Sequence, residues 1–81
     1  MILKEKKQEN YLGFNIIASK FEYQDINKNK IIKIYECKIY KENNFFINLG
    51  ECNDGTKFTN INQCINQGKS FLNTLKQLKK I

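Results

Sequence analysis

The sequence has no histidine, proline, tryptophan or arginine among its 81 residues. Without histidine, the chain can form neither a Ser-His nor a Cys-His catalytic pair, and it has no imidazole general base. Its acidic residues lack the paired spacing of a glycoside hydrolase, and no glycine-rich loop precedes a helix pattern. These absences predict that the protein is not an enzyme and that it uses no cofactor.

Cysteine is sparse. Cys37, Cys52 and Cys64 show no CxxC spacing, and there is no histidine to complete a zinc site. Cys37 and Cys64 fall in patterns that we expect to be buried, where cysteine acts as a small hydrophobic residue. We therefore predict reduced, inert thiols and no bound metal.

Long hydrophobic runs are also missing. No apolar segment approaches the ~20 residues that a transmembrane helix needs, and residues 1–10 lack the apolar stretch of a signal peptide. We therefore expect a soluble, cytoplasmic protein without membrane contact. A chain of 81 residues suits one small domain, so we assign 1–81 to a single domain. For residues 1–10, a frayed tail, a short helix and an edge strand all remain open.

The clearest element in the sequence is an amphipathic helix within residues 58–81. Thr59 and Asn60 are both suitable N-cap residues, and Gln63 stands three positions after Asn60, as in a capping box. We expect Leu72 and Leu75 to lie deepest against the rest of the fold. Apolar and small residues recur at helical spacing and form one stripe, which consists of Ile61, Cys64, Ile65, Gly68, Phe71, Leu72, Leu75 and Leu78.

The sequence upstream of this helix has the pattern of β-strands. Alternating apolar and polar residues predict strands at 11–23, 31–41 and 45–50. Three isoleucines within 31–34 break the alternation, which predicts a bulge or burial on both faces there. Asn-Asp-Gly at 53–55 signals a tight turn. Because the connections are too short for crossovers, we predict an α+β fold (β-β-β-α), with a three- to four-stranded antiparallel sheet and one C-terminal helix packed on one face.

Alternation assigns two faces to the predicted sheet. The helix stripe would cover one face, which consists of Leu12, Phe14, Ile16, Tyr35, Cys37, Ile39, Phe45, Ile47 and Leu49. The other face would expose apolar and aromatic side chains, with Phe21 or Tyr23 among them. A small monomer seldom exposes a large apolar patch. Either the N-terminal segment folds over this face, or the face binds a protein partner or a second copy of the chain, which is the alternative we favour. The expected partner-binding residues are Ile17, Ile34, Tyr40 and Phe46.

Charge is distributed unevenly along the chain, whose net charge is +6. Residues 1–54 hold nine lysines and all eight acidic residues, whereas residues 55–81 hold five lysines and no acid. At about 100° per residue, Lys69, Lys76 and Lys80 fall on one side of the predicted helix, beside the apolar stripe. This basic ridge is either a solvated flank or a contact for nucleic acid or an acidic protein surface.

Several short segments resemble known small proteins. The run YLGFNI at 11–16, Asp54-Gly55, and Phe58-Thr59 before a terminal helix look like features of small β-β-β-α proteins carried by phages and mobile elements, such as anti-CRISPR-like inhibitors. They are also similar to the three-stranded N-terminal DNA-binding domain of tyrosine-recombinase integrases. In that family the open sheet face lies on DNA and carries Arg and Lys, whereas Lys38 is nearly the only cation expected on the open face here.

Three functions agree with these features. The first is a non-catalytic phage or mobile-element protein that inhibits a host defence nuclease or nucleoprotein complex through protein–protein contact, as the resemblance implies. The second is a nucleic-acid-binding module that uses the basic C-terminal helix. The third is a homo-oligomeric structural protein, with a homodimer as its simplest form. We favour the first, because it agrees with the small size, the missing catalytic groups and the open apolar face together.

Overall fold

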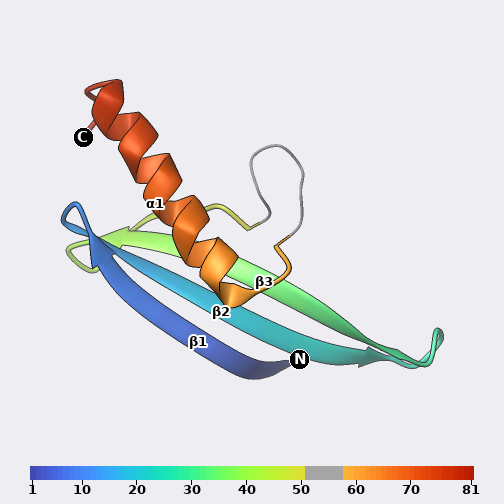
Figure 1. The fold of residues 1–81 in the computed structure, drawn as a ribbon. Helices are drawn as coiled ribbons and strands as arrows, with labels where there is room; N and C mark the ends of the chain where they lie inside the picture. Colours follow the sequence, from blue (N-terminus) through green and yellow to red (C-terminus); the bar gives the residue numbers. More distant parts are fainter. Residues whose placement is uncertain (51–57) are drawn as a thin grey trace.

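Residues 1–50 and 58–81 are described by the computed structural model, and they form one sheet and one helix (Figure 1). Neighbouring strands are antiparallel in the order β1-β2-β3-β4, and the helix packs on one face of the sheet. The predicted α+β class is confirmed, with four strands before the helix. The turn predicted at 53–55 lies outside the described residues. The elements are β1 (Ile2–Tyr11), β2 (Phe14–Asp25), β3 (Lys30–Lys41), β4 (Asn44–Asn48) and α1 (Ile61–Gln77).

The N-terminal segment forms an edge strand, β1, that pairs along β2. The chain then reverses through Leu12 and Gly13 alone, because Tyr11 is the direct partner of Phe14. Both turn residues have positive φ, 52° and 81°, as a type I′ hairpin requires. The strand predicted at 11–23 is therefore wrong at its start, and Leu12 lies in a turn instead of on the helix-covered face.

β2 and β3 form a long hairpin with an unbroken register. Their eleven residue pairs end with Asp25 opposite Lys30. The turn at this end is held by Asp25 Oδ1, which accepts the backbone N–H groups of Asn27 and Lys28 at 3.1 and 3.2 Å. The irregularity predicted within 31–34 is wrong on both counts, because the pairing there has no bulge and none of these residues is buried.

Two bulges occur elsewhere in the sheet. Lys4 is the extra residue on β1, and Phe46 is the extra residue on β4. An extra residue shifts the alternation of its strand by one position, so the side chains on one side of the bulge change faces.

The start of α1 follows the expected capping pattern. The side-chain oxygen of Asn60 accepts the backbone N–H of Gln63 at 2.9 Å, which confirms Asn60 as the N-cap residue. Gln63 Oε1 in turn accepts the backbone N–H of Thr59 at 2.7 Å, one residue before the position that a capping box uses. The two bonds give partners to the backbone N–H groups of Thr59 and Gln63, which have no carbonyl partner within the helix.

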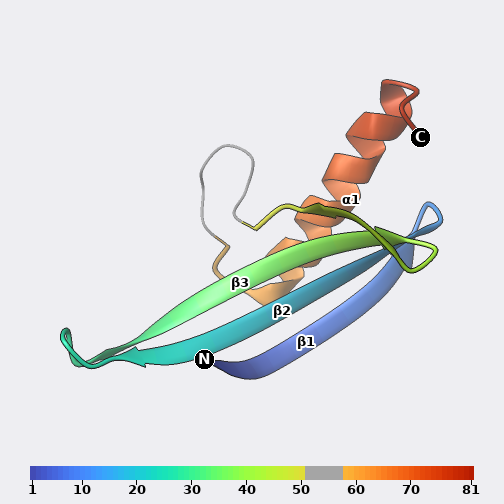
Figure 2. The same cartoon turned by 180° about the vertical axis from the view of Figure 1, so that it is seen from behind.

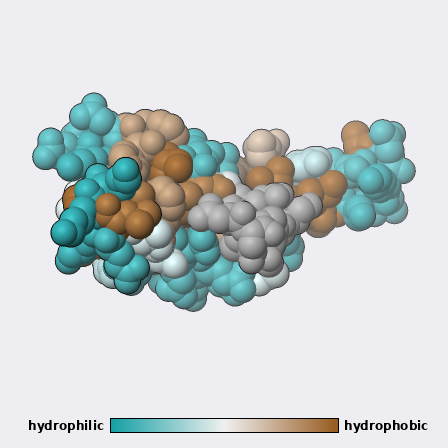
Figure 3. Space-filling view, turned by 90° about the horizontal axis from the view of Figure 1, so that it is seen from above, coloured by the Kyte–Doolittle hydropathy of each residue, from teal (hydrophilic) through white to brown (hydrophobic). Residues whose placement is uncertain are grey.

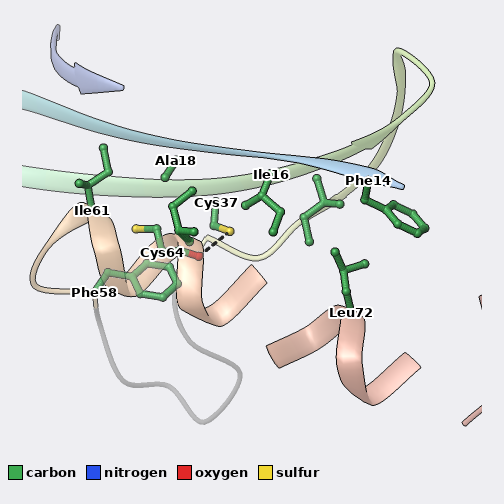
Figure 4. Close-up of a cluster of buried hydrophobic side chains, with 10 residues drawn as sticks. Phe14, Ile16, Ala18, Cys37, Phe58, Ile61, Cys64 and Leu72 are labelled. Carbon is green, nitrogen blue, oxygen red and sulfur yellow. Dashed lines mark hydrogen bonds between the residues drawn. The ribbon is translucent and has the colours of Figure 1, made fainter. Parts of the chain in front are cut away.

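The core lies between α1 and the face of β2 and β3 that α1 covers (Figure 4). The helix approaches the sheet closely at Gly68, where an added Cβ would lie 2.8 Å from Cγ2 of Ile16. Cys37 Sγ donates to the Cys64 carbonyl at 3.1 Å across the same contact. The buried residues are Phe14, Ile16, Ala18, Cys37, Ile39, Phe58, Ile61, Cys64, Ile65 and Leu72.

The burial of the apolar residues of α1 differs from the prediction at the C-terminal end of the helix. Leu72 is fully buried, as expected. Leu75 is only half-buried, and Leu78 is 61% exposed. The reason is that α1 is inclined to the sheet and its C-terminal end rises away from the strands (Figures 1 and 2), so the last apolar residues of the stripe have little to pack against.

Candidate interaction surface

The apolar side of the sheet changes from one face to the other along β2. In the half beneath α1, the buried residues Phe14, Ile16 and Ala18 point toward the helix. Beyond Ala18 the pairing with β3 continues without a bulge, so side chains keep alternating. Phe21 and Tyr23 therefore point to the open face, which is the face opposite α1.

The apolar side chains of β3 change faces at the same point along the hairpin. Cys37 is buried under α1, whereas Ile32 and Ile34 are one position out of phase with it and lie on the open face. Register places Ile34 directly opposite Phe21 and Ile32 directly opposite Tyr23. Directly opposed residues share a face and contact one another, so the four side chains form one cluster.

β1 adds one residue to this cluster through its bulge. In a regular strand without a bulge, Leu3 would share the helix-covered face with Glu5, because residues two positions apart point to the same face. With the bulge, Leu3 lies opposite Phe21 on the open face, and it is 50% exposed. We call the resulting surface the arm patch, and it consists of Leu3, Phe21, Tyr23, Ile32 and Ile34.

Most of the patch belongs to an arm, residues 21–34, that projects past α1 (Figure 1) and forms the narrow extension of the molecule in Figure 3. The described residues span 47 Å along their longest axis but only 26 and 18 Å along the others. No residue of the arm is buried. Seen from behind, the open face carries no helix (Figure 2), so within residues 1–50 and 58–81 no element covers the patch.

A polar belt separates the arm patch from the rest of the open face. Ser19 lies between Lys6 on β1 and Glu36 on β3. Glu36 also forms an ion pair with Lys38, with 3.7 Å between Oε2 and Nζ. The open face is therefore less apolar than the sequence suggested, and its apolar side chains are concentrated in the arm.

Three of the four expected partner-binding residues lie on the open face, but they do not form one cluster. Ile34 belongs to the arm patch. Ile17 lies beyond the polar belt, opposite Lys38. Tyr40 lies farther along, where its ring centroid is 5.7 Å from that of Phe45.

The fourth residue, Phe46, was assigned to the wrong face. Its ring centroid lies 5.1 Å from that of Phe14, on the side that α1 covers. The bulge at Phe46 is the physical reason, because it shifts the alternation of β4. Phe45 faces outward opposite Tyr40 instead and is 59% exposed, so the predicted burial of Phe45 is also wrong.

The expected basic ridge is interrupted at Lys69. Lys69 Nζ lies 2.8 Å from a carboxylate oxygen of Glu9 on β1, and 5.6 Å from the centroid of the Tyr11 ring. Tyr11 itself donates through its hydroxyl to Asn73 of α1 at 2.8 Å. Lys69 therefore helps to fasten α1 to β1, and its charge is matched within the fold.

The ridge also loses Lys80, which lies past the end of α1. The backbone N–H groups of Lys79 and Lys80 return to the carbonyls of Lys76 and Leu75, with Lys79 in the left-handed conformation at φ 56°. These are the two hydrogen bonds of a Schellman ending. Only Lys76 keeps its expected place as an exposed residue of α1, beside a shallow cavity of about 230 Å³ that it lines with Leu12, Phe14, Lys41 and Ile81.

Two features are absent from the part of the chain that the structure describes. No three His, Cys, Asp or Glu side chains there come together as metal ligands. No described helix combines the length and hydropathy that a bilayer span requires.

Sequence reasoning missed Leu3 and Ile32, and it left Phe21 and Tyr23 as alternatives although both belong to the patch. The signal was present in the two strands of the hairpin. Along β2, most of the apolar residues stand at even positions up to Ala18 and at odd positions from Phe21 onward. Along β3, most of them stand at even positions up to Ile34 and at odd positions from Cys37 onward. Aligning the two strands as a hairpin would have shown both changes at one level.

No family model matches this chain, and neither a curated protein nor a solved structure is significantly similar to it.

Proposed function

We propose that this chain is a small non-catalytic binding protein of the phage or mobile-element type, which inhibits a host defence nuclease or nucleoprotein complex by protein–protein contact at the arm patch. The observation that carries the proposal is that the apolar side chains of β2 and β3 move from the helix-covered face to the open face at the same point along the two paired strands. This change of face places Phe21, Tyr23, Ile32 and Ile34 on a face that no described element covers, and the bulge in β1 adds Leu3 to them.

The composition of the patch suits a protein contact. Aromatic side chains such as Phe21 and Tyr23 are typical interface anchors, because they bury much area and lose little conformational freedom. The hairpin is held by eleven residue pairs without a bulge. A pre-ordered surface loses less entropy on binding than a flexible loop does. The patch contains no cation, so it favours a protein partner over nucleic acid.

The partner class rests on the resemblance to small phage inhibitors. Inhibition by contact requires no catalytic residue, which agrees with a sequence that lacks histidine. A bound inhibitor needs only to cover a working surface of the nuclease or to hold it in an inactive arrangement.

The test compares two double variants of β3 that differ in the face they change. Ile32→Ser with Ile34→Ser alters the arm patch, and Ile31→Ser with Lys33→Ser is the matched control on the opposite face of the same strand. Each is expressed in a bacterial host with an active defence nuclease, and phage plating efficiency is measured. We expect the wild-type chain and the control to restore plating and the patch variant not to.

A second measurement separates loss of binding from loss of folding. Affinity capture should recover subunits of the nuclease complex with the wild-type chain and the control, after nuclease treatment of the lysate as well as before. If neither plating nor capture distinguishes the two double variants, the arm patch is not the contact surface. If the wild-type chain protects no phage from any defence nuclease, inhibition of nucleases is not its function.

A further inference from the structure

Among residues 1–50 and 58–81, no strand pairs with the outer edge of β3 along the arm. β4 pairs with β3 only from Lys38 to Lys41, and the N–H of Leu49 then bonds to the Cys37 carbonyl. Between Lys30 and Glu36, the described residues supply no partner on this side. Such an edge presents unpaired backbone N–H and C=O groups, and it is a template for another strand.

A groove of about 460 Å³ follows this edge. Its lining comes from both faces of the sheet, as expected for a space beside a strand rather than above it. Ile34 and Tyr23 border it on the open face, and Tyr35 and Phe58 border it on the helix side. Asn48 at the end of β4 closes one end, so the groove continues the line of β4 along β3.

The sequence of this edge, KIIKIYE at 30–36, is complementary to itself when it is read antiparallel about Lys33. Lys30 then lies opposite Glu36, twice in a symmetric pair. Ile32 lies opposite Ile34. Opposite charges and pairs of β-branched residues are the cross-strand combinations that stabilise antiparallel sheets.

Neighbouring symmetric registers are poorer. A two-fold centred on Ile32 places Lys30 opposite Ile34, and one centred on Ile34 places Glu36 opposite Ile32. Registers between residues would pair the open face of one copy with the helix-covered face of the other. Only the register about Lys33 matches faces, charges and apolar side chains together.

We propose that a second copy of the chain pairs antiparallel with this edge, β3 to β3 about Lys33, and forms one continuous sheet with a two-fold axis perpendicular to it. Both helices then lie on one side of the sheet. The two arm patches meet on the other side and double the continuous apolar face. The contact is isologous, so it closes after two copies.

One pair in this register is unfavourable, since the two Lys33 side chains meet at the axis. Each has an acid beside it in its own chain, because Glu22 of β2 lies directly opposite Lys33. The open-face pairs between Lys30 and Glu36 lie on either side of the axis and supply two attractions. This inference stands apart from the proposed function, because self-pairing is measured without any target.

The test uses charge reversal, measured by sedimentation velocity over a concentration series. The wild-type chain should sediment as a dimer. Lys30→Glu alone and Glu36→Lys alone each replace two attractions with two repulsions, and we expect dissociation constants at least about tenfold higher. Lys28→Glu, in the turn outside the paired segment, is the matched control for net charge and should dimerise like the wild type.

Mixing is the discriminating step. In an equimolar mixture of the two single variants, every contact between positions 30 and 36 regains opposite charges, so heterodimers should form with nearly wild-type affinity. One variant is labelled with ¹⁵N, so that native mass spectrometry distinguishes the heterodimer from both homodimers by mass. The double variant Lys30→Glu with Glu36→Lys should recover in the same way. A wild-type chain that stays monomeric at all concentrations would overturn the proposal. So would a dimer that the single reversals leave unchanged, or one that dissociates only when Ile32 and Ile34 are replaced by Ser, which would indicate face-to-face packing instead.

Discussion

The two halves of the sheet direct their apolar side chains to opposite faces. In the half beneath α1, Ile16 and Cys37 are fully buried against a helix that approaches closely at Gly68. In the arm, Phe21 and Ile34 pair with each other on the far face, and no described element covers them. The same two strands run through both halves without a bulge, so the difference lies in the sequence and not in the backbone.

This comparison separates two uses of a hydrophobic pattern. A change of side at one level of two paired strands leaves backbone pairing intact but directs apolar residues to a second surface. If the arm needed a core of its own for stability, these residues would be covered within the chain. Phe21 and Ile34 are instead only half-buried, and no described element covers them, so in the described residues the helix packs against the other half of the sheet. This contrast is what supports the proposal of the arm patch as a contact surface.

The largest expected effect belongs to the covered half. Leu72→Ala should lower the free energy of unfolding by about 2–5 kcal/mol, because Leu72 is fully buried beneath the sheet. Leu75→Ala is the matched control on the same helix, and because Leu75 is only half-buried it should cost clearly less. Urea denaturation followed by circular dichroism measures both. Equal losses would mean that α1 lies flat on the sheet along its whole length.

A smaller effect is expected at the close approach of α1. Gly68→Ala gains about 1 kcal/mol of helix propensity, but its Cβ would lie 2.8 Å from Ile16 Cγ2 and 3.4 Å from Cys37 Sγ. Overpacking of a core costs roughly 1–3 kcal/mol, so we expect a net loss of up to about 2 kcal/mol. The exposed residue Ser70 supplies the control, since Ser70→Ala should leave stability unchanged or slightly raise it. A stabilised Gly68→Ala variant would contradict the tight contact between helix and sheet.

The smallest effect is expected in the arm. Ile32→Ser with Ile34→Ser should cost less unfolding free energy than Leu72→Ala, about 1–2 kcal/mol in total, because the cost arises from strand propensity and half-buried contacts instead of a filled core. The same denaturation experiment measures it. A loss as large as that of Leu72→Ala would place the arm patch inside the core and remove the contrast between the two halves.

The sequence predicted the parts of the fold that follow local rules. The antiparallel sheet followed from period-two alternation and short connections, and the start of α1 followed from Asn60 and Gln63, whose cap hydrogen bond is present. The end of α1 could not be predicted in the same way. Lys79 adopts the left-handed conformation that usually marks a glycine, so no residue type signalled the Schellman ending.

The faces of the outer strands were also beyond local rules. The bulges at Lys4 and Phe46 stand in ordinary strand sequence, and each exchanges the faces of its neighbours. Phe45 and Phe46 are chemically alike, so alternation alone could not decide which one packs on Phe14. The basic ridge failed for a different reason, because the partner of Lys69 is Glu9, sixty residues earlier on a strand that the sequence left undecided.

Methyl NOEs in the isotope-labelled protein test most directly whether the apolar side chains of the two halves of the sheet point to opposite faces. We expect the Ile16 methyl groups to show NOEs to the Hα protons of Gly68, since a Cβ added at Gly68 would lie 2.8 Å from Ile16 Cγ2. The Ile34 methyl groups should show NOEs to the ring of Phe21 and none to any residue of α1. NOEs from Ile34 to the helix, together with none from Ile16, would contradict the assignment of the two faces.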